Sequence, residues 1–316
     1  MKAALLFALA IGACAPALAA DPQPRSENRF AAAIAPAERF EVGSMLVERH
    51  GQRGRPLILI PGLGSGAWAW QETVRQFSGE HVIYVVTLAG FDGRAPAAGK
   101  TLDNAQMALR ELIASRKLAK PVLVGHSLGA ALSIAFAEQH SDLIGGVVAV
   151  DGLPVFPGIE ETPAEQRAQM SAGVKASMAG ASKETFALQQ QQYMRGIGTI
   201  DMARADELAK LSARSDPATM IDAMAELFVL DLRPGLSNIK VPVLLIAPYF
   251  EADATQVGMT REAKTAYYTS LMAGTPTLQV VSIAPSRHFV MFDQPQMLTD
   301  ALRGYLKSLS GDRHEN

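Results

Sequence analysis

Ser127 has the local sequence of a reactive serine. It lies at the centre of a Gly-x-Ser-x-Gly pentapeptide, which joins an apolar run at 121–124 to a helical stretch of small residues at 130–137. Where a strand turns this sharply into a helix, Gly125 and Gly129 leave room for neighbouring backbone, and the serine is strained with its hydroxyl exposed. The alternative is a helix capped by Ser127 after a flexible loop. The strand before it and the helix after it favour an activated serine.

A serine hydroxyl needs a base to remove its proton near neutral pH, and histidine has a suitable pKa. Five of the six histidines lie in a turn, at a strand start, at a helix end, in the tail, or beside the serine with the side chain directed away from it: His50, His81, His140, His314 and His126. His288 remains, just after the apolar run at 278–283. Parallel strands carry functional loops at their carboxyl ends. We therefore predict that His288 is the base and that the reaction is acyl transfer to water.

The elements that would position these residues follow an alternating pattern. Unbroken apolar runs separated by helical stretches predict an α/β fold, with a mostly parallel central sheet and helices on both faces. Alternating apolar residues at 39–50 predict one first strand. The apolar runs are 56–60, 81–86, 121–124, 145–150, 241–246 and 278–283, and the helical stretches are 102–116, 128–139, 260–272 and 295–309.

The interval 153–233 breaks the alternation, because it contains helical patterns and no convincing strand. We predict a helical cap inserted after the strand that follows the nucleophile helix. Its apolar character favours small to medium hydrophobic esters as substrates. The predicted organisation is a signal peptide at 1–20, a flexible lead-in at 21–38, an α/β core at 39–152 and 234–310, the cap at 153–233 and a tail at 311–316.

Composition excludes several classes of partner and cofactor. The formal net charge is −2, with 48% hydrophobic and 19% charged residues, so there is no basic field for nucleic acid. Cys14 is the single cysteine, and no His/Asp/Glu cluster has metal-ligand spacing, so no metal is expected. No Gly-x-Gly-x-x-Gly follows a strand, so no nucleotide cofactor is expected either.

The first 20 residues are typical of a secretory signal peptide. Lys2 precedes an apolar core at 3–13, and an Ala-x-Ala pattern at 17–19 favours cleavage near Ala19 or Ala20. We therefore expect export to the periplasm or beyond, with no permanent membrane span. The stretch 11–14 loosely matches a bacterial lipobox that would lipidate Cys14, but the Ala-x-Ala pattern downstream favours simple cleavage.

From about Arg39 to Leu309 the chain resembles the α/β-hydrolase superfamily, as a serine esterase-like member with a helical lid. The matching motifs are Pro61-Gly62-Leu63-Gly64, Gly125-His126-Ser127-Leu128-Gly129 and Ser286-Arg287-His288-Phe289 followed by Asp293-Gln294-Pro295. The first loop often begins with His-Gly in this family and begins with Pro61-Gly62 here. The resemblance implies a nucleophile elbow at Ser127 and an oxyanion hole formed by the backbone N–H groups of Leu63 and Leu128.

The resemblance also implies an acid between Ser127 and His288 in the sequence. Many members place it after the strand that corresponds to 241–246, where this chain has aromatic residues and Asp253 comes late. Others place it one strand earlier, where Asp151 follows 145–150 directly. A strand end holds a carboxylate rigidly, as orientation of the imidazole requires. We therefore favour Asp151, with Asp253 as the alternative, and expect Asp92, Asp231 and Asp293 to stabilise structure.

The predicted function is hydrolysis of carboxylic esters through an acyl-enzyme. Aminopeptidases and carbon–carbon bond hydrolases share the scaffold and remain alternatives. A non-enzymatic ligand-binding module is a third alternative, which has no use for both Ser127 and His288. Trp68 and Trp70, which follow the first loop, either pack a helix or line an acyl pocket.

Overall fold

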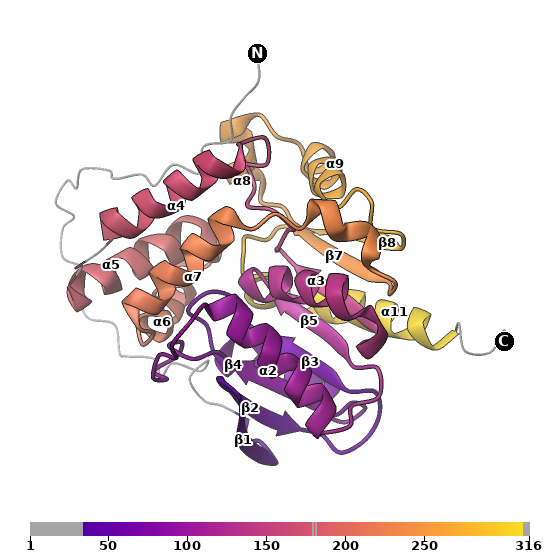
Figure 1. Ribbon diagram of the computed structural model, residues 1–316. Coiled ribbons are helices and arrows are strands. Elements are labelled where there is room, and N and C mark those ends of the chain that lie inside the picture. The colour runs from indigo at the N-terminus through magenta and orange to yellow at the C-terminus, as the bar shows by residue number, and fades with distance from the viewer. Residues whose placement is uncertain (1–33, 179, 181, 312–316) are drawn as a thin grey trace.

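The computed structural model describes residues 34–178, 180 and 182–311 and contains one eight-stranded sheet (Figure 1). The strand order is β1-β2-β4-β3-β5-β6-β7-β8. β2 pairs antiparallel with β1 and β4, and all other pairs are parallel, which confirms the predicted fold class. The strands are β1 Glu38–Val42, β2 Met45–His50, β3 Leu57–Ile60, β4 Ile83–Thr87, β5 Val122–His126, β6 Gly146–Val150, β7 Val243–Pro248 and β8 Leu278–Ile283.

The prediction of one strand at 39–50 was wrong. This stretch forms the hairpin of β1 and β2, in which Val42 pairs with Met45 across a two-residue turn. Gly43 has φ +52°, a left-handed conformation that glycine adopts without steric cost. The apolar alternation on both sides of Gly43 has the same period as one longer strand, so the alternation alone could not locate the turn.

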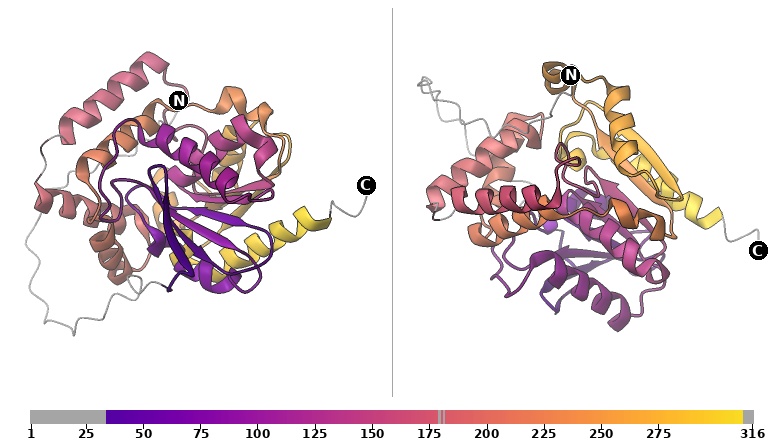
Figure 2. Two further views of the ribbon diagram at one scale, coloured as in Figure 1. Left: turned by 60° about the horizontal axis from the view of Figure 1, so that its bottom comes forward. Right: turned by 45° about the horizontal axis from the view of Figure 1, so that its top comes forward.

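Helices cover both faces of the sheet (Figures 1 and 2). Successive residues of a strand point to opposite faces, and accordingly Ile58 and Ile60 of β3 belong to one buried cluster while Leu57 and Leu59 belong to the other. The first cluster includes residues of α2 Thr101–Ser115, α3 Leu128–His140 and α9 Arg261–Leu271. The second includes residues of η1 Ala67–Trp70, α1 Gln71–Phe77 and α11 Pro295–Gly311.

Four α-helices and a π-helical turn lie between β6 and β7, in the interval where a helical insertion was predicted. They are α4 Ala164–Met178, α5 Lys183–Tyr193, η3 Met194–Gly198, α6 Met202–Ser212 and α7 Pro217–Val229. The side chains of Ser182, Asp201 and Asp216 accept hydrogen bonds from the first turns of α5, α6 and α7, as N-caps do. The two ends of this segment lie next to each other, because Val155 and Asp231 form an antiparallel bridge.

Short elements connect the remaining parts. They are η2 Ser141–Leu143, η4 Arg233–Asn238, α8 Glu251–Ala254, η5 Thr255–Val257 and α10 Val290–Asp293. The predicted signal peptide, with Cys14, lies outside the described residues, as do residues 312–316 of the predicted tail. Within the part of the chain that the structure describes, no helix is both long and apolar enough to cross a membrane.

Candidate active site

Ser127 lies in the sharp turn between β5 and α3. Its backbone has φ +53° and ψ −118°, a strained conformation for a residue with a side chain. A Cβ atom at Gly125 would lie 2.1 Å from the carbonyl oxygen of Gly129, and one at Gly129 would lie 2.3 Å from that of Ile60. Both positions therefore require glycine. The turn fixes Ser127 at the carboxyl end of the sheet, where its N–H donates to Val150 of β6.

Asp151 and His288 meet at the same edge of the sheet. Asp151 directly follows β6, with φ +46°, and its N–H donates to the carbonyl of Ile246. His288 lies in the loop after β8, and its Nδ1 is 2.5 Å from Oδ2 of Asp151. Since both side chains are mostly buried, this contact is shielded from water. Asp151 can therefore hold the His288 ring in one orientation.

Asp253, the alternative acid, does not contact His288. It lies in α8, and its carboxylate accepts hydrogen bonds from Nε and Nη2 of Arg287 at 2.8 and 2.7 Å. The other aspartates also bind arginines or backbone. Asp92 pairs with Arg214, Asp231 pairs with Arg167 and Arg233, and Asp293 accepts from the N–H groups of Ile200 and Arg287.

The carboxyl group of Asp151 is ionised. Burial would raise its pKa, but the His288 charge and hydrogen bond, together with Lys264 and Tyr268, outweigh burial and lower the pKa to about 2. Tyr268 of α9 donates from its hydroxyl to Oδ1 of Asp151 at 2.5 Å. Tyr268 was not predicted from the sequence, because no local pattern relates a tyrosine on α9 to a strand end 117 positions earlier.

Ser127 Oγ makes no hydrogen bond to the residues that the structure describes. The side chain of Ser127 is half-buried, so its hydroxyl remains accessible. Hydrogen bonds between a nucleophile and its base are often formed only once substrate is bound. The neighbouring residue is close to the base, because the rings of His126 and His288 are 4.5 Å apart.

His126 was set aside at the sequence level as a residue whose side chain turns away from the serine. It is fully buried, and its Nε2 is 3.0 Å from the backbone carbonyl oxygen of His288. Burial and the nearby His288 charge lower the pKa of His126 to about 3, so the ring is neutral and Nε2–H can donate to that carbonyl. His126 therefore supports the loop that carries His288.

The loop after β3 reaches the serine from the other side. A Cβ atom at Gly62 would lie 2.8 Å from Nδ1 of His126 and 3.1 Å from Cβ of Ser127. Leu63 N–H donates to none of the described residues, and Leu128 is the first residue of α3, where N–H groups have no acceptor within the helix. These two N–H groups are therefore available as oxyanion donors.

The helical insertion contacts the His288 loop through its π-helical turn. The N–H groups of His288 and Phe289 donate to the carbonyls of Ile197 and Gly198 at 3.1 and 2.9 Å. The ring of Tyr193, just before this turn, stands edge-on to His288 at 6.3 Å. A π-helical turn often marks a functional site.

Trp68 and Trp70 are 4% and 0% exposed. Trp68 stacks on Phe289 and Phe292, immediately after His288, at 6.3 and 6.2 Å between ring centroids. Trp68 thus packs against residues that follow His288, and Trp70 is buried within the same hydrophobic cluster. Both positions favour the packing interpretation over an acyl pocket.

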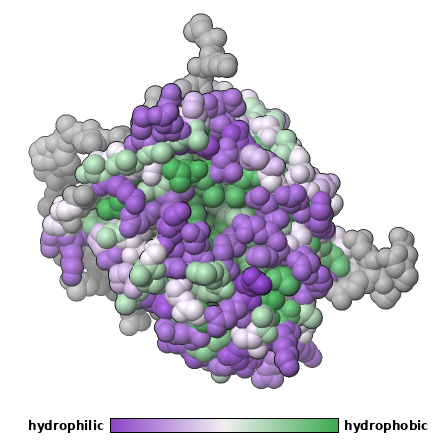
Figure 3. Space-filling model, in the orientation of Figure 1, coloured by the Kyte–Doolittle hydropathy of each residue, from purple (hydrophilic) through white to green (hydrophobic). Residues whose placement is uncertain are grey.

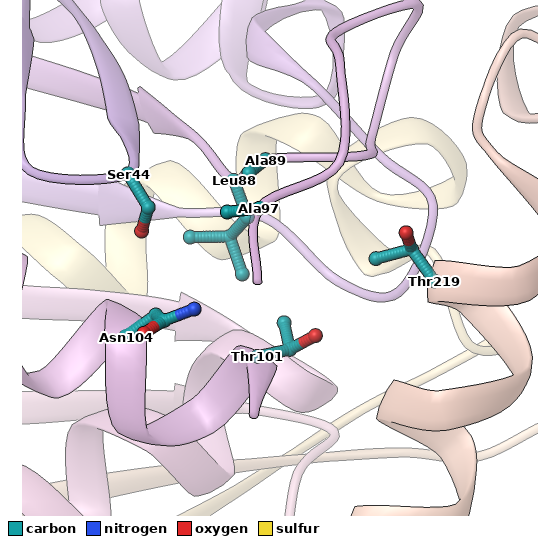
Figure 4. A pocket seen from close by; sticks show the side chains of 7 residues that line it. All are labelled: Ser44, Leu88, Ala89, Ala97, Thr101, Asn104 and Thr219. Carbon is teal, nitrogen blue, oxygen red and sulfur yellow. The ribbon is translucent and has the colours of Figure 1, made fainter. Parts of the chain in front are cut away.

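Two other hollows are separate from these residues. A cavity of about 10 Å³, enough for one water, lies among Ser44, Leu88, Thr101 and Thr219 (Figure 4). A groove of about 460 Å³ runs between α4 and the start of α7, past Lys175 and Ile221. Among the described residues, no three His, Cys, Asp or Glu side chains are grouped to hold a metal ion.

Comparison with known proteins agrees with this fold. The sequence model of the alpha/beta hydrolase family matches residues 57–301. The chain belongs to this family. This α/β-hydrolase is 25% identical to the pimeloyl-[acyl-carrier protein] methyl ester esterase of Vibrio cholerae over 198 residues, 61% of this chain and 74% of that esterase. It is 26% identical to the 2-succinyl-6-hydroxy-2,4-cyclohexadiene-1-carboxylate synthase of Klebsiella pneumoniae over 193 residues, 59% of this chain and 74% of the synthase.

Solved structures share the fold. A carboxylesterase of the thaumarchaeon Nitrososphaera gargenis superimposes with a TM-score of 0.68 at 18% identity, over 85% of this chain and 97% of that one. The protein is therefore an α/β-hydrolase enzyme with esterases among its relatives, as the sequence motifs predicted.

Proposed function

We propose that this α/β-hydrolase is an exported serine hydrolase that cleaves carboxylic esters through an acyl-enzyme on Ser127. The 2.5 Å hydrogen bond between Asp151 and His288, beside a serine at φ +53°, is the observation that carries the proposal. In this arrangement Asp151 fixes the tautomer of His288, which leaves Nε2 free to accept a proton from Ser127.

The reaction then proceeds in two acyl-transfer steps. Ser127 Oγ attacks the ester carbonyl carbon and His288 takes the serine proton, while the N–H groups of Leu63 and Leu128 stabilise the oxyanion. The ester C–O bond breaks, and His288 returns the proton to the leaving alcohol. Water, deprotonated by His288, attacks the acyl-enzyme, which releases the acid and regenerates Ser127.

We further propose that the substrate is a small to medium hydrophobic ester. Apolar side chains gather beside the C-terminal end of α7, between α4 and α9, on the face seen in Figure 3. In this region the rings of Phe156 and Phe228 stack at 4.4 Å and Val229 is 46% exposed. Relatives that act on methyl esters support methyl esters of carboxylic acids as the first class to examine.

The test uses the enzyme without residues 1–20, a fluorophosphonate probe and p-nitrophenyl and methyl esters of increasing chain length. We expect labelling at Ser127, located by peptide mass spectrometry, and ester turnover that is lost in Ser127→Ala. Labelling with turnover of aminoacyl amides alone would favour an aminopeptidase. If folded protein is not labelled and hydrolyses nothing, the chain is a binding module.

Export is tested separately, on cells that express the full chain. We expect the enzyme in the periplasmic fraction or the medium, with a mature N-terminus at Ala20 or Asp21. Incorporation of labelled fatty acid, lost in Cys14→Ser, would show instead that Cys14 is lipidated.

A further inference from the structure

We propose that Tyr268 is a positioning residue for the Asp151–His288 pair: its hydroxyl fixes the rotation of the carboxylate and draws off part of its charge. This inference rests on the proposed function, because it concerns the same pair. The carboxylate has two oxygens with different partners. Oδ2 contacts Nδ1 of His288 and Oδ1 accepts from the hydroxyl of Tyr268, each at 2.5 Å.

The carboxylate needs this second contact. The torsion that rotates an aspartate carboxylate has broad minima, so a single hydrogen bond leaves its plane poorly defined. The backbone of Asp151 is held by the N–H bond to Ile246, but that bond does not orient the side chain. Tyr268 is only 7% exposed, which places its hydroxyl rigidly at Oδ1.

The direction of the hydrogen bond is determined by the protonation state of Tyr268. Burial and the charge of Asp151 raise the pKa of Tyr268 well above its ordinary value, so the phenol keeps its proton and donates it. A charge-assisted hydrogen bond of this kind is short and roughly twice as strong as a neutral one. The contact therefore reduces the negative charge that His288 experiences.

Other charged and titratable groups surround the Asp151–His288 pair and contribute to its electrostatic environment. Lys264, one turn before Tyr268 on α9, lies 5.5 Å from the Tyr268 ring and lowers the pKa of Asp151. Neutral His126 of β5 contacts the backbone carbonyl of His288, and Tyr193 of the insertion lies edge-on to the His288 ring. The His288 loop itself carries Arg287, paired with Asp253, and Asp293.

Tyr267 offers a matched control on the same helix. Its hydroxyl accepts from the N–H of Gly158 at 3.0 Å and donates to Glu160 at 3.1 Å, and it contacts neither Asp151 nor His288. Tyr267→Phe therefore removes the same atom from the neighbouring position without changing the partners of Asp151.

The experiment compares wild type, Tyr268→Phe and Tyr267→Phe by ester kinetics across pH and by the proton NMR resonance of His288 Nδ1–H. In Tyr268→Phe the carboxylate regains charge and loses its fixed plane. We expect kcat to fall about tenfold with KM unchanged, and the midpoint of the acidic limb of kcat/KM to rise by roughly half a pH unit. The resonance should shift, and Tyr267→Phe should match wild type in kcat, KM, midpoint and resonance.

If Tyr268→Phe keeps the wild-type pH profile, kcat and resonance, or if Tyr267→Phe changes them equally, the inference is overturned. Should Tyr268→Phe misfold, 3,5-difluorotyrosine at position 268 keeps the packing and strengthens the donor, and the midpoint should then fall. A wild-type enzyme without hydrolase activity would refute the proposed function and with it the role of Tyr268 in catalysis. The His288 resonance needs no turnover, so it distinguishes that result from the absence of an effect of the Tyr268 hydrogen bond on the Asp151–His288 pair.

Discussion

Arg287 binds Asp253 through two hydrogen bonds of 2.8 and 2.7 Å and so keeps that carboxylate away from His288, the next residue along the chain. After β7, therefore, the carboxylate of Asp253 is engaged in an ion pair with Arg287. The carboxylate that contacts His288 is that of Asp151, which directly follows β6. This difference separates the two candidate acids experimentally.

Asp151→Asn should lower kcat by about 10³- to 10⁴-fold, because an amide cannot hold the His288 tautomer or stabilise its charged form. Asp253→Asn should lower kcat by no more than a few fold. Steady-state hydrolysis of a p-nitrophenyl ester measures both variants. The reverse order would assign the acid to Asp253.

Arg287→Met should weaken the contacts between the His288 loop and the helical insertion. Besides Asp253, the guanidinium of Arg287 donates to the carbonyls of Arg195 and Thr199 at 2.8 and 3.3 Å. Loss of these charge-assisted bonds should reduce the free energy of unfolding by roughly 1–3 kcal/mol and kcat by several fold. Urea unfolding and kinetics measure the two effects.

Arg195→Met is the control for that variant, because the Arg195 side chain pairs with Asp206 within the insertion and half of it is exposed. It should alter unfolding by less than about 1 kcal/mol and leave kcat unchanged. Equal losses in both variants would mean that Arg287 has no special part in holding the loop.

His126 should make stability depend on pH. Its pKa is about 3 in the folded chain and near 6.5 when unfolded, so both states are neutral above pH 6.5. As the pH falls from 6.5 towards 3, the unfolded chain takes up a proton that the folded chain excludes. The free energy of unfolding should therefore fall by up to about 1.4 kcal/mol per pH unit in this window.

His126→Gln keeps a donor for the His288 carbonyl but cannot be protonated. Urea unfolding between pH 7 and 4.5 should show a shallower loss of stability in this variant than in wild type. His140→Gln, at the end of α3, serves as the comparison and should retain the wild-type slope. If both variants keep that slope, His126 is not the source of the acid sensitivity.

Gly62→Ala tests the oxyanion loop. A methyl group there would press on Nδ1 of His126 and on Cβ of Ser127, so the loop must move and Leu63 N–H must move with it. Loss of one oxyanion donor typically costs about 3 kcal/mol of barrier, or roughly 100-fold in kcat. Gly79→Ala, where a Cβ has no neighbour within 4 Å, should retain full activity. Activity within twofold of wild type in Gly62→Ala would exclude this loop from the reaction.

The sequence was most informative where function depends on local pattern. The parallel sheet and the turn at Ser127 follow from runs of apolar residues and from glycine positions, which are visible within a few residues. The acid was harder to assign, because Asp151 and Asp253 both follow parallel strands whose carboxyl ends lie at the same edge of the sheet. Only the three-dimensional positions show that one contacts His288 and the other contacts Arg287.

The supporting residues were not predictable from the sequence. Tyr268 and His126 act through contacts across 117 and 162 positions. The sequence around Tyr268 does not distinguish it from a core residue, and the place of His126 in the Gly-x-Ser-x-Gly motif does not reveal its contact with the His288 carbonyl. The β1–β2 hairpin was missed for a different reason, since Gly43 interrupts an alternation that reads equally well as one strand.

The strand order makes β1 and β8 the edge strands of the sheet, and the two edges differ in how they are protected against pairing with other molecules. Glu38, Arg39 and Glu41 place charges along β1, and such charges discourage backbone pairing between copies. β8 carries no charged side chain, and its protection there comes from Arg261, which binds the Ser282 carbonyl and hydroxyl from α9. In concentrated or partly unfolded samples, aggregation should therefore begin at β8, and an added lysine on that strand would improve the yield of soluble enzyme.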